Sequence, residues 1–153
     1  MRIGVISDTH GMLRPEALAA LADVDHILHA GDVGNPEILD RLRELAPVTA
    51  IRGNVDIHGD CALLPATEMV ELAGCFVYLV HSLDWIDILP RVAGVKLVVS
   101  GHSHKPDIAL RDEVLFLNPG SAGPRRFKLP VTIAIVSIEQ GLPQARIVEL
   151  ATP

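Results

Sequence analysis

Short apolar runs that end at metal-binding residue types constrain this chain more than any other feature of its sequence. The runs IGVIS, HILHAG, TAIRG, VYLV and KLVVSG have the length of buried β-strands. Polar residues follow directly after them: Asp8 and His10, Asp32, Asn54, His81, and finally His102 and His104. In α/β sheets, ligands bind beyond the carboxyl ends of the strands, so we expect these side chains at one rim.

The first half of the chain alternates strand-like runs with helical patterns. Strands are expected at residues 3–7, 26–30 and 48–52, and a helix is expected over residues 15–22. A second helix should begin with Asn35 as its N-cap and Pro36 as its first residue. This strand–helix–strand order predicts parallel pairing through right-handed crossovers.

The second half has more closely spaced strand-like runs, at residues 67–72, 76–80, 95–100, 108–110, 114–117, 131–138 and 145–150. A hairpin-like break at Ala73-Gly74 and a turn at Gln140-Gly141 favour antiparallel pairing. A short helix interrupted by proline is expected near residues 87–92. Together the two halves predict a mixed α/β domain with two packed sheets.

Length and composition favour a single domain over residues 1–153. The content of apolar residues (49%) is high enough to build a core that needs no disulfide bonds or structural metal ions. Cys61 and Cys75 form no zinc-type cluster, so we expect free thiols and a cytoplasmic protein. No apolar run approaches the roughly 18 residues needed to cross a bilayer, so no membrane partner is expected.

The formal net charge of −6 argues against a nucleic-acid polymer as a partner, because it would repel a phosphate backbone. Arg125, Arg126 and Lys128 form a basic cluster that is too small to reverse this argument. These residues are candidate contacts for a small anionic substrate, and solvated surface charge is the alternative.

Each polar motif is weak alone, because Gly31-Asp32 and Gly53-Asn54 are also ordinary turn dipeptides. The ordered set carries the prediction, since chance rarely places all of these residues at strand ends. In an extended segment, residues i and i+2 project to the same side, so Asp8 with His10 and His102 with His104 can each converge as a pair. Oxygen and imidazole ligands without thiolate suit Mn²⁺, Fe or Zn²⁺.

The ordered motifs resemble those of the calcineurin-like metallophosphoesterases, in particular the small bacterial and archaeal phosphodiesterases. The matching segments are Asp8-x-His10, Gly31-Asp32, Gly53-Asn54-x-Asp56, His81, Gly101-His102-Ser103-His104 and Asn118-Pro119-Gly120-Ser121. The resemblance implies a four-layer α/β/β/α sandwich of two mixed sheets. Its metal site would lie at the carboxyl-terminal ends of the strands.

Carried over by position, the resemblance implies two divalent ions, with Mn²⁺ expected and Fe, Zn²⁺ or Ni²⁺ as alternatives. The first ion would be held by Asp8, His10, Asp32 and His104, and the second by Asp32, Asn54, His81 and His102. Asp32 would bridge them, and Asp32, Asn54 and His81 would be the catalytic residues. A metal-bridging hydroxide would attack the phosphorus of a small phosphoester substrate in line.

Four further residues qualify this reading. Val55 stands where phosphoprotein phosphatases of the superfamily have a histidine, and Ser82 stands where the family usually has glycine. Asp56 and His29 are candidates for residues that orient the ligands. The alternative for Asp56 is an exposed aspartate in a turn, and the alternative for His29 is a histidine packed in the core.

The sequence therefore predicts a two-metal hydrolase of phosphate esters, with phosphodiesters as the expected class. A non-catalytic protein-binding scaffold is an alternative, since a retromer subunit shares the fold, although such a scaffold should lack some ligands. A nucleotide-polyphosphate hydrolase is a third reading. The physiological substrate and the oligomeric state, including a homo-oligomer, stay open.

Overall fold

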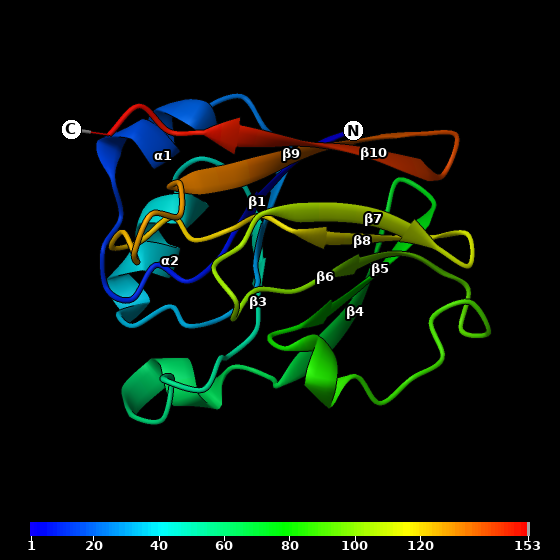
Figure 1. Ribbon diagram of the computed structural model, residues 1–153, viewed down its shortest axis with the longest axis horizontal. Helices are drawn as coiled ribbons and strands as arrows, with labels where there is room; N and C mark the ends of the chain where they lie inside the picture. Colours follow the sequence, from blue (N-terminus) through cyan, green and yellow to red (C-terminus); the bar gives the residue numbers. More distant parts are fainter. Residues whose placement is uncertain (153) are drawn as a thin grey trace.

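The computed structural model describes residues 1–152 and contains two mixed five-stranded sheets (Figure 1). The first sheet has the order β10-β9-β1-β2-β3. Its strands are β1 (Arg2–Ile6), β2 (His26–His29), β3 (Val48–Ala50), β9 (Thr132–Glu139) and β10 (Leu142–Glu149). The strands β1, β2 and β3 are parallel, as predicted, whereas β9 is antiparallel to both β1 and β10.

The second sheet has the order β4-β5-β6-β8-β7. Its strands are β4 (Thr67–Leu72), β5 (Cys75–Val80), β6 (Val95–Val99), β7 (Asp107–Arg111) and β8 (Val114–Asn118). The antiparallel prediction is confirmed for β4 with β5, for β7 with β8 and for β9 with β10. The strand β6 is parallel to both β5 and β8, so the second sheet is mixed as well, and the connections on either side of β6 are long enough for crossovers.

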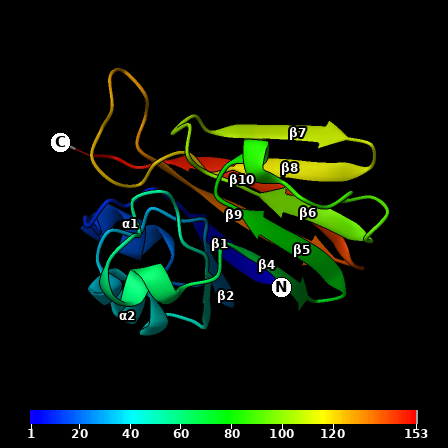
Figure 2. The ribbon, with the colours of Figure 1, turned by 90° about the horizontal axis from the view of Figure 1, so that it is seen from below.

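Two helices join the parallel strands of the first sheet and lie together on one side of the molecule (Figures 1 and 2). They are α1 (Pro15–Ala20) and α2 (Pro36–Arg43). Asn35 caps α2 as predicted, since its side-chain oxygen accepts a hydrogen bond from the backbone N–H of Glu37 at 3.0 Å. The 3₁₀ helix η1 (Gly59–Leu63) follows β3.

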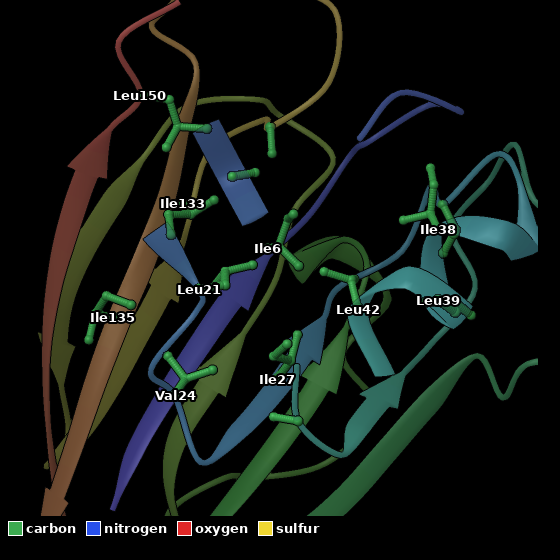
Figure 3. Close-up of a cluster of buried hydrophobic side chains, with 14 of the residues drawn as sticks. Ile6, Leu21, Val24, Ile27, Ile38, Leu39, Leu42, Ile133, Ile135 and Leu150 are labelled. Atoms are coloured by element: carbon green, nitrogen blue, oxygen red, sulfur yellow. The ribbon is translucent and has the colours of Figure 1, made fainter. Parts of the chain in front are cut away.

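Side-chain alternation along the strands divides the core into layers. Ile6 and Ile27 face the helices, where they pack with Leu21 and Leu42 (Figure 3). The opposite face of the first sheet packs on the second sheet through residues that include Ile3, Val5, Leu28, Leu79 and Leu97. The predicted sandwich of two packed sheets is therefore confirmed.

The outer face of the second sheet is covered by chain without an α-helix. Tyr78, Val80 and Val98 form a buried cluster there, and Ile86 and Ile88 pack against it. The fourth layer thus consists of the 3₁₀ helix η2 (Leu83–Trp85) and residues 86–94.

The helix predicted near residues 87–92 is wrong, because this stretch forms bends and turns. Ile86 and Ile88 contact the same cluster, and this two-residue spacing belongs to extended chain rather than to a helix. Between them, Asp87 accepts a hydrogen bond from the Tyr78 hydroxyl at 2.7 Å. Across residues 1–152, none of the helices has the length and apolarity to span a membrane.

Gly4 leads to a stability prediction for the contact between β1 and the end of α1. A Cβ at Gly4 would lie 2.2 Å from Cδ2 of Leu21, so Gly4→Ala should lower the free energy of unfolding by about 1–3 kcal/mol. In a Leu21→Ala background the same change should cost much less, because the clashing methyl group is gone. Urea denaturation of the four proteins measures both costs. Equal costs in the two backgrounds would show that Leu21 is not the cause.

Candidate metal centre

Five loops that follow β1, β2, β3, β5 and β6 bring the seven predicted ligands together. Asp8 and His10 follow β1, Asp32 follows β2, and the remaining residues follow the other strands: Asn54, His81, His102 and His104. Asp8, Asp32, His81 and His104 are buried, whereas Asn54 and His102 are exposed. The cluster therefore has a buried centre and one open side.

Two carboxylates lie at the middle of this cluster. Oδ1 of Asp8 is 3.8 Å from Nε2 of His10, 3.8 Å from Nε2 of His81 and 3.5 Å from Nε2 of His104. Oδ2 of Asp32 is 3.6 Å from Nε2 of His10 and 3.3 Å from Nε2 of His81. Potential ligand atoms of Asp8, His10 and His104 lie within 4.8 Å of one another, as do those of Asp8, Asp32 and His81.

The second oxygen of each carboxylate is held by donors outside the cluster. Oδ2 of Asp8 accepts hydrogen bonds from the Ser7 hydroxyl at 2.7 Å and from the backbone N–H of His102 at 3.1 Å. Oδ1 of Asp32 accepts one from the backbone N–H of Val55 at 2.9 Å. Each aspartate is thereby fixed with one oxygen directed at the histidines.

Electrostatics keeps both aspartates ionised. Burial alone would raise the pKa of Asp8, but the His104 ring, the His81 charge and the Ser7 hydroxyl outweigh it, so the pKa lies below its usual value. Burial opposes ionisation of Asp32 as well, and the His81 ring and the Val55 N–H together lower its pKa. The centre therefore carries two negative charges at neutral pH.

His81 faces these charges with a nitrogen that has no hydrogen-bond partner. Its Nδ1 donates to the backbone carbonyl of Ala30 at 2.7 Å, which leaves the lone pair of Nε2 pointing at the carboxylates. Burial lowers the pKa of His81, but the contact with Asp32, the Ala30 carbonyl and the charge of Asp8 together raise it above its usual value. A proton or a metal ion on Nε2 is what this environment favours.

Buried polar atoms without partners indicate that the donor set fits a metal ion. Oδ1 of Asp8 and Nε2 of His81 are both buried without a hydrogen bond and lie 3.8 Å from each other. Nε2 of His10 also lies only 3.4 Å from Nε2 of His104. Such orphaned atoms are costly in a folded protein, and a cation among them would remove the cost.

The remaining two ligands lie on the exposed side, beside His81. Nδ1 of His102 is 3.1 Å from Oδ1 of Asn54, and the His102 ring centroid is 5.3 Å from that of His81. His104 instead faces Asp8 and His10. The two histidines of the Gly-His-x-His motif thus belong to opposite sides of the cluster.

The expected convergence of i, i+2 residues is found for Asp8 and His10 but is wrong for His102 and His104, and the backbone shows that neither pair is extended. Left-handed φ angles occur at five predicted ligands: Asp8 (56°), His10 (47°), Asp32 (55°), His102 (71°) and His104 (64°). Residues other than glycine rarely adopt this region, and such strain clusters at functional sites. The directions of these side chains are therefore set by tight turns and not by the alternation of an extended strand.

Two buried residues tie the ligand loops to one another. Asp56 accepts hydrogen bonds from the backbone N–H groups of Val33, Gly34 and Gly53 at 2.9–3.1 Å, so it joins the Asp32 loop to the Asn54 loop. Asp56 is buried, so the alternative of an exposed aspartate in a turn does not hold.

His29 performs a similar task between the first two loops. Its Nδ1 accepts from the backbone N–H of Gly31 at 3.1 Å, so its Nε2 carries the proton and donates to Thr9 Oγ1 at 3.1 Å. The Thr9 hydroxyl in turn donates to the Val33 carbonyl at 2.8 Å. Burial lowers the pKa of His29 to about 4, so the ring stays neutral and keeps this arrangement.

Ser82 fits its position without the glycine that is usual in the family. Its φ of −121° is accessible to any residue, and its hydroxyl caps η2 by accepting from the backbone N–H of Asp84 at 3.3 Å.

The sequence analysis missed Trp85, which η2 places at the open side of the cluster. Its ring centroid is 5.8 Å from that of His102 and 6.1 Å from that of His81, and the residue is 51% exposed. The available signal was the position of the only tryptophan, four residues after His81.

Hollows adjoin the cluster on two sides. One of about 450 Å³ is lined by residues that include His102, Lys105 and Phe116. Another of about 280 Å³ is lined by His10, His104, Pro124, Arg125 and Arg126. The site can therefore accommodate a ligand that extends beyond one phosphate group.

Comparison with known proteins agrees with this geometry. The sequence model of the calcineurin-like phosphoesterase superfamily domain matches residues 1–141. A probable metallophosphoesterase of Methanothermobacter thermautotrophicus is 35% identical over an alignment that covers 100% of this chain and 95% of the relative. Phosphodiesterase YfcE of Escherichia coli is 33% identical over 79% of each chain.

A solved structure extends the likeness to the fold. Vps29 of Entamoeba histolytica, determined in complex with Zn²⁺, superposes with a TM-score of 0.74 at 25% identity, covering 97% of this chain and 99% of that one. These findings confirm the resemblance of the ordered motifs, and the chain belongs to the calcineurin-like phosphoesterase superfamily.

Proposed function

We propose that the protein hydrolyses phosphodiesters with the help of two divalent metal ions. The observation that carries this proposal is the buried set of carboxylate oxygens and imidazole nitrogens that face one another, an arrangement that a bound cation would stabilise. Asp8, His10, Asp32 and His104 would hold one ion, and Asp32, Asn54, His81 and His102 would hold the other, with Mn²⁺ as the expected metal. The names of the Methanothermobacter and Escherichia coli relatives support the same chemistry.

The position of Asp32 supports its proposed role as the shared ligand. Its Oδ2 lies 3.6 Å from Nε2 of His10 and 3.3 Å from Nε2 of His81, and these two histidines belong to different ligand sets. The Val55 N–H holds the other oxygen, so the carboxylate cannot rotate freely. Bound divalent ions would supply an activated water near neutral pH and positive charge for the phosphoryl oxygens.

Charge balance favours a diester as the substrate. Two divalent ions would bring four positive charges, and the two aspartates would neutralise two of them. A net charge of about +2 would then face the nucleophile and the phosphate. A phosphodiester carries one negative charge and matches this balance better than a dianionic monoester does.

The alternative of a protein-binding scaffold draws on the likeness to Vps29. All seven positions carry residues that can bind a metal ion, and five of these residues have left-handed backbone conformations: Asp8, His10, Asp32, His102 and His104. Selection for binding alone would not require this arrangement, so we favour the hydrolase.

Asp32 provides a test of the shared-ligand assignment. Asp32→Ala should lower kcat/KM on bis-p-nitrophenyl phosphate by about a thousandfold or more, because neighbouring cations would lose their common anion and part of their stabilising effect on the transition state. The matched control is Asp40→Ala, which removes an exposed carboxylate paired with Arg43. The kinetics should be combined with Mn²⁺ titration monitored by Trp85 fluorescence. The Trp85 ring lies close to the rings of His81 and His102, so a paramagnetic ion bound there should quench its fluorescence. Full activity and unchanged quenching in Asp32→Ala would overturn the assignment.

The raised pKa of His81 gives a pH prediction. In the metal-free protein its Nε2 keeps a proton at pH values above the ordinary 6.5, and this proton must leave before a metal ion can bind. Apparent Mn²⁺ affinity should therefore rise with pH through neutrality and fall by about tenfold per pH unit below it, with activity following. Trp85 quenching measured from pH 8 to pH 5 gives the affinity. A flat profile would argue against histidine ligation.

Val55 generates a prediction about leaving groups. Its side chain cannot donate a proton, so the position after Asn54 supplies no acid for the departing alkoxide. Aryl phosphodiesters with acidic leaving groups should be preferred over alkyl esters, and log kcat/KM should fall steeply as the leaving-group pKa rises. Val55→His should flatten this slope. A wild-type slope near zero would mean that another group already serves as the acid.

A further inference from the structure

The rim of the site contains a short basic segment, residues 123–130, that the proposed chemistry does not use. It carries Arg125, Arg126 and Lys128 and no acidic residue, although the chain as a whole has a net charge of −6. Among residues 1–152, none of these three cations has a carboxylate within ion-pair distance. Two neighbouring arginines without acidic partners are a local positive charge that attracts anions.

The start of this segment is fixed against the loop that carries Asp8. The Arg14 guanidinium donates to the carbonyl of Gly123 at 3.1 and 3.3 Å, and the Ser121 hydroxyl donates to the carbonyl of Asp8 at 3.0 Å. A Cβ at Gly123 would lie 2.5 Å from the Asp8 carbonyl oxygen and 2.4 Å from that of Thr9, so the two backbones are in close contact. The arginines are therefore held beside the cluster.

Both arginines line the hollow of about 280 Å³ that also contains His10 and His104. These histidines belong to the buried side of the candidate metal centre, so a phosphate held there lies next to the hollow. The planar guanidinium group presents several N–H donors in a geometry that matches phosphate oxygens. The hollow is thus suited to a second phosphate group that is attached to the same substrate.

We propose that Arg125 and Arg126 bind a second phosphate group, so that the preferred substrates are phosphodiesters carrying an additional phosphomonoester. A nucleotide diester with a terminal phosphate has this chemistry. The inference rests on the proposed function, because it names the substrate class of that site. It also explains how a chain with excess negative charge selects a polyanionic substrate, since the arginine pair supplies local attraction that the overall charge does not.

A matched pair of chromogenic substrates tests this specificity. Thymidine 5′-(p-nitrophenyl phosphate) and the same compound with a 3′-phosphate differ only in the second phosphate group, and both release p-nitrophenolate. The Mn²⁺-loaded wild-type protein should show kcat/KM about tenfold higher on the 3′-phosphorylated compound. In the Arg125→Ala/Arg126→Ala variant this ratio should fall to about 1, and in the corresponding double lysine variant it should be intermediate. Arg91→Ala, which removes an arginine paired with Asp112 and Glu113, should keep the wild-type ratio.

Binding separates this proposal from the proposed hydrolysis. Isothermal titration with thymidine 3′,5′-bisphosphate and thymidine 5′-monophosphate needs no turnover, so it remains informative if no diester is hydrolysed. The bisphosphate should bind the wild-type protein about tenfold more tightly than the monophosphate, and the double alanine variant should bind both equally. Equal affinities in the wild-type protein, or a preference that persists in the double alanine variant, would overturn the proposal.

Discussion

Two buried carboxylates that face histidine nitrogens are the constraint on which the rest of this structure depends. Asp8 and Asp32 are buried, and each directs one oxygen at histidine nitrogens while a hydroxyl or backbone N–H group holds the other. The Ala30 carbonyl accepts a hydrogen bond from Nδ1 of His81, so Nε2 faces the carboxylates, where a proton or a metal ion is favoured. Uncompensated buried charges cost several kcal/mol, and a bound cation would remove this cost. A metal ion bound among these residues would therefore stabilise the fold.

The fold supports this arrangement by ending several strands at the same edge and linking the loops that follow. Asp56 and the neutral His29 connect the loops after β1, β2 and β3 through hydrogen bonds to backbone groups and to Thr9. These contacts offset the strain of left-handed backbone at Asp8, His10 and Asp32. The two packed sheets provide the rigid base, because the core between them is continuous up to the strands that precede the ligand loops.

The periodicity of the apolar residues and the polar residues at the strand ends made most of the strands and the candidate metal site predictable from the sequence. The apolar runs located the strands, and the polar residues after them located the candidate metal ligands, because both signals are local. The pairing of β6 and the extended path of residues 86–94 depend on contacts between distant segments, such as Ile86 and Ile88 with Tyr78, which local patterns do not contain. The placement of Trp85 over His81 and His102, and of Arg125 and Arg126 beside His10, likewise follows from the folding of loops onto the rim. The Gly-His-x-His pair diverges because of positive φ angles that a strand pattern does not predict.

Anomalous diffraction from crystals of the Mn²⁺-loaded protein, recorded at the manganese absorption edge, tests the central claim most directly. Our account predicts two peaks about 3.5–4 Å apart, with Asp32 between them. One peak should lie beside Asp8, His10 and His104, and the other beside Asn54, His81 and His102. A single peak at full occupancy, or peaks that do not contact Asp32, would contradict the account.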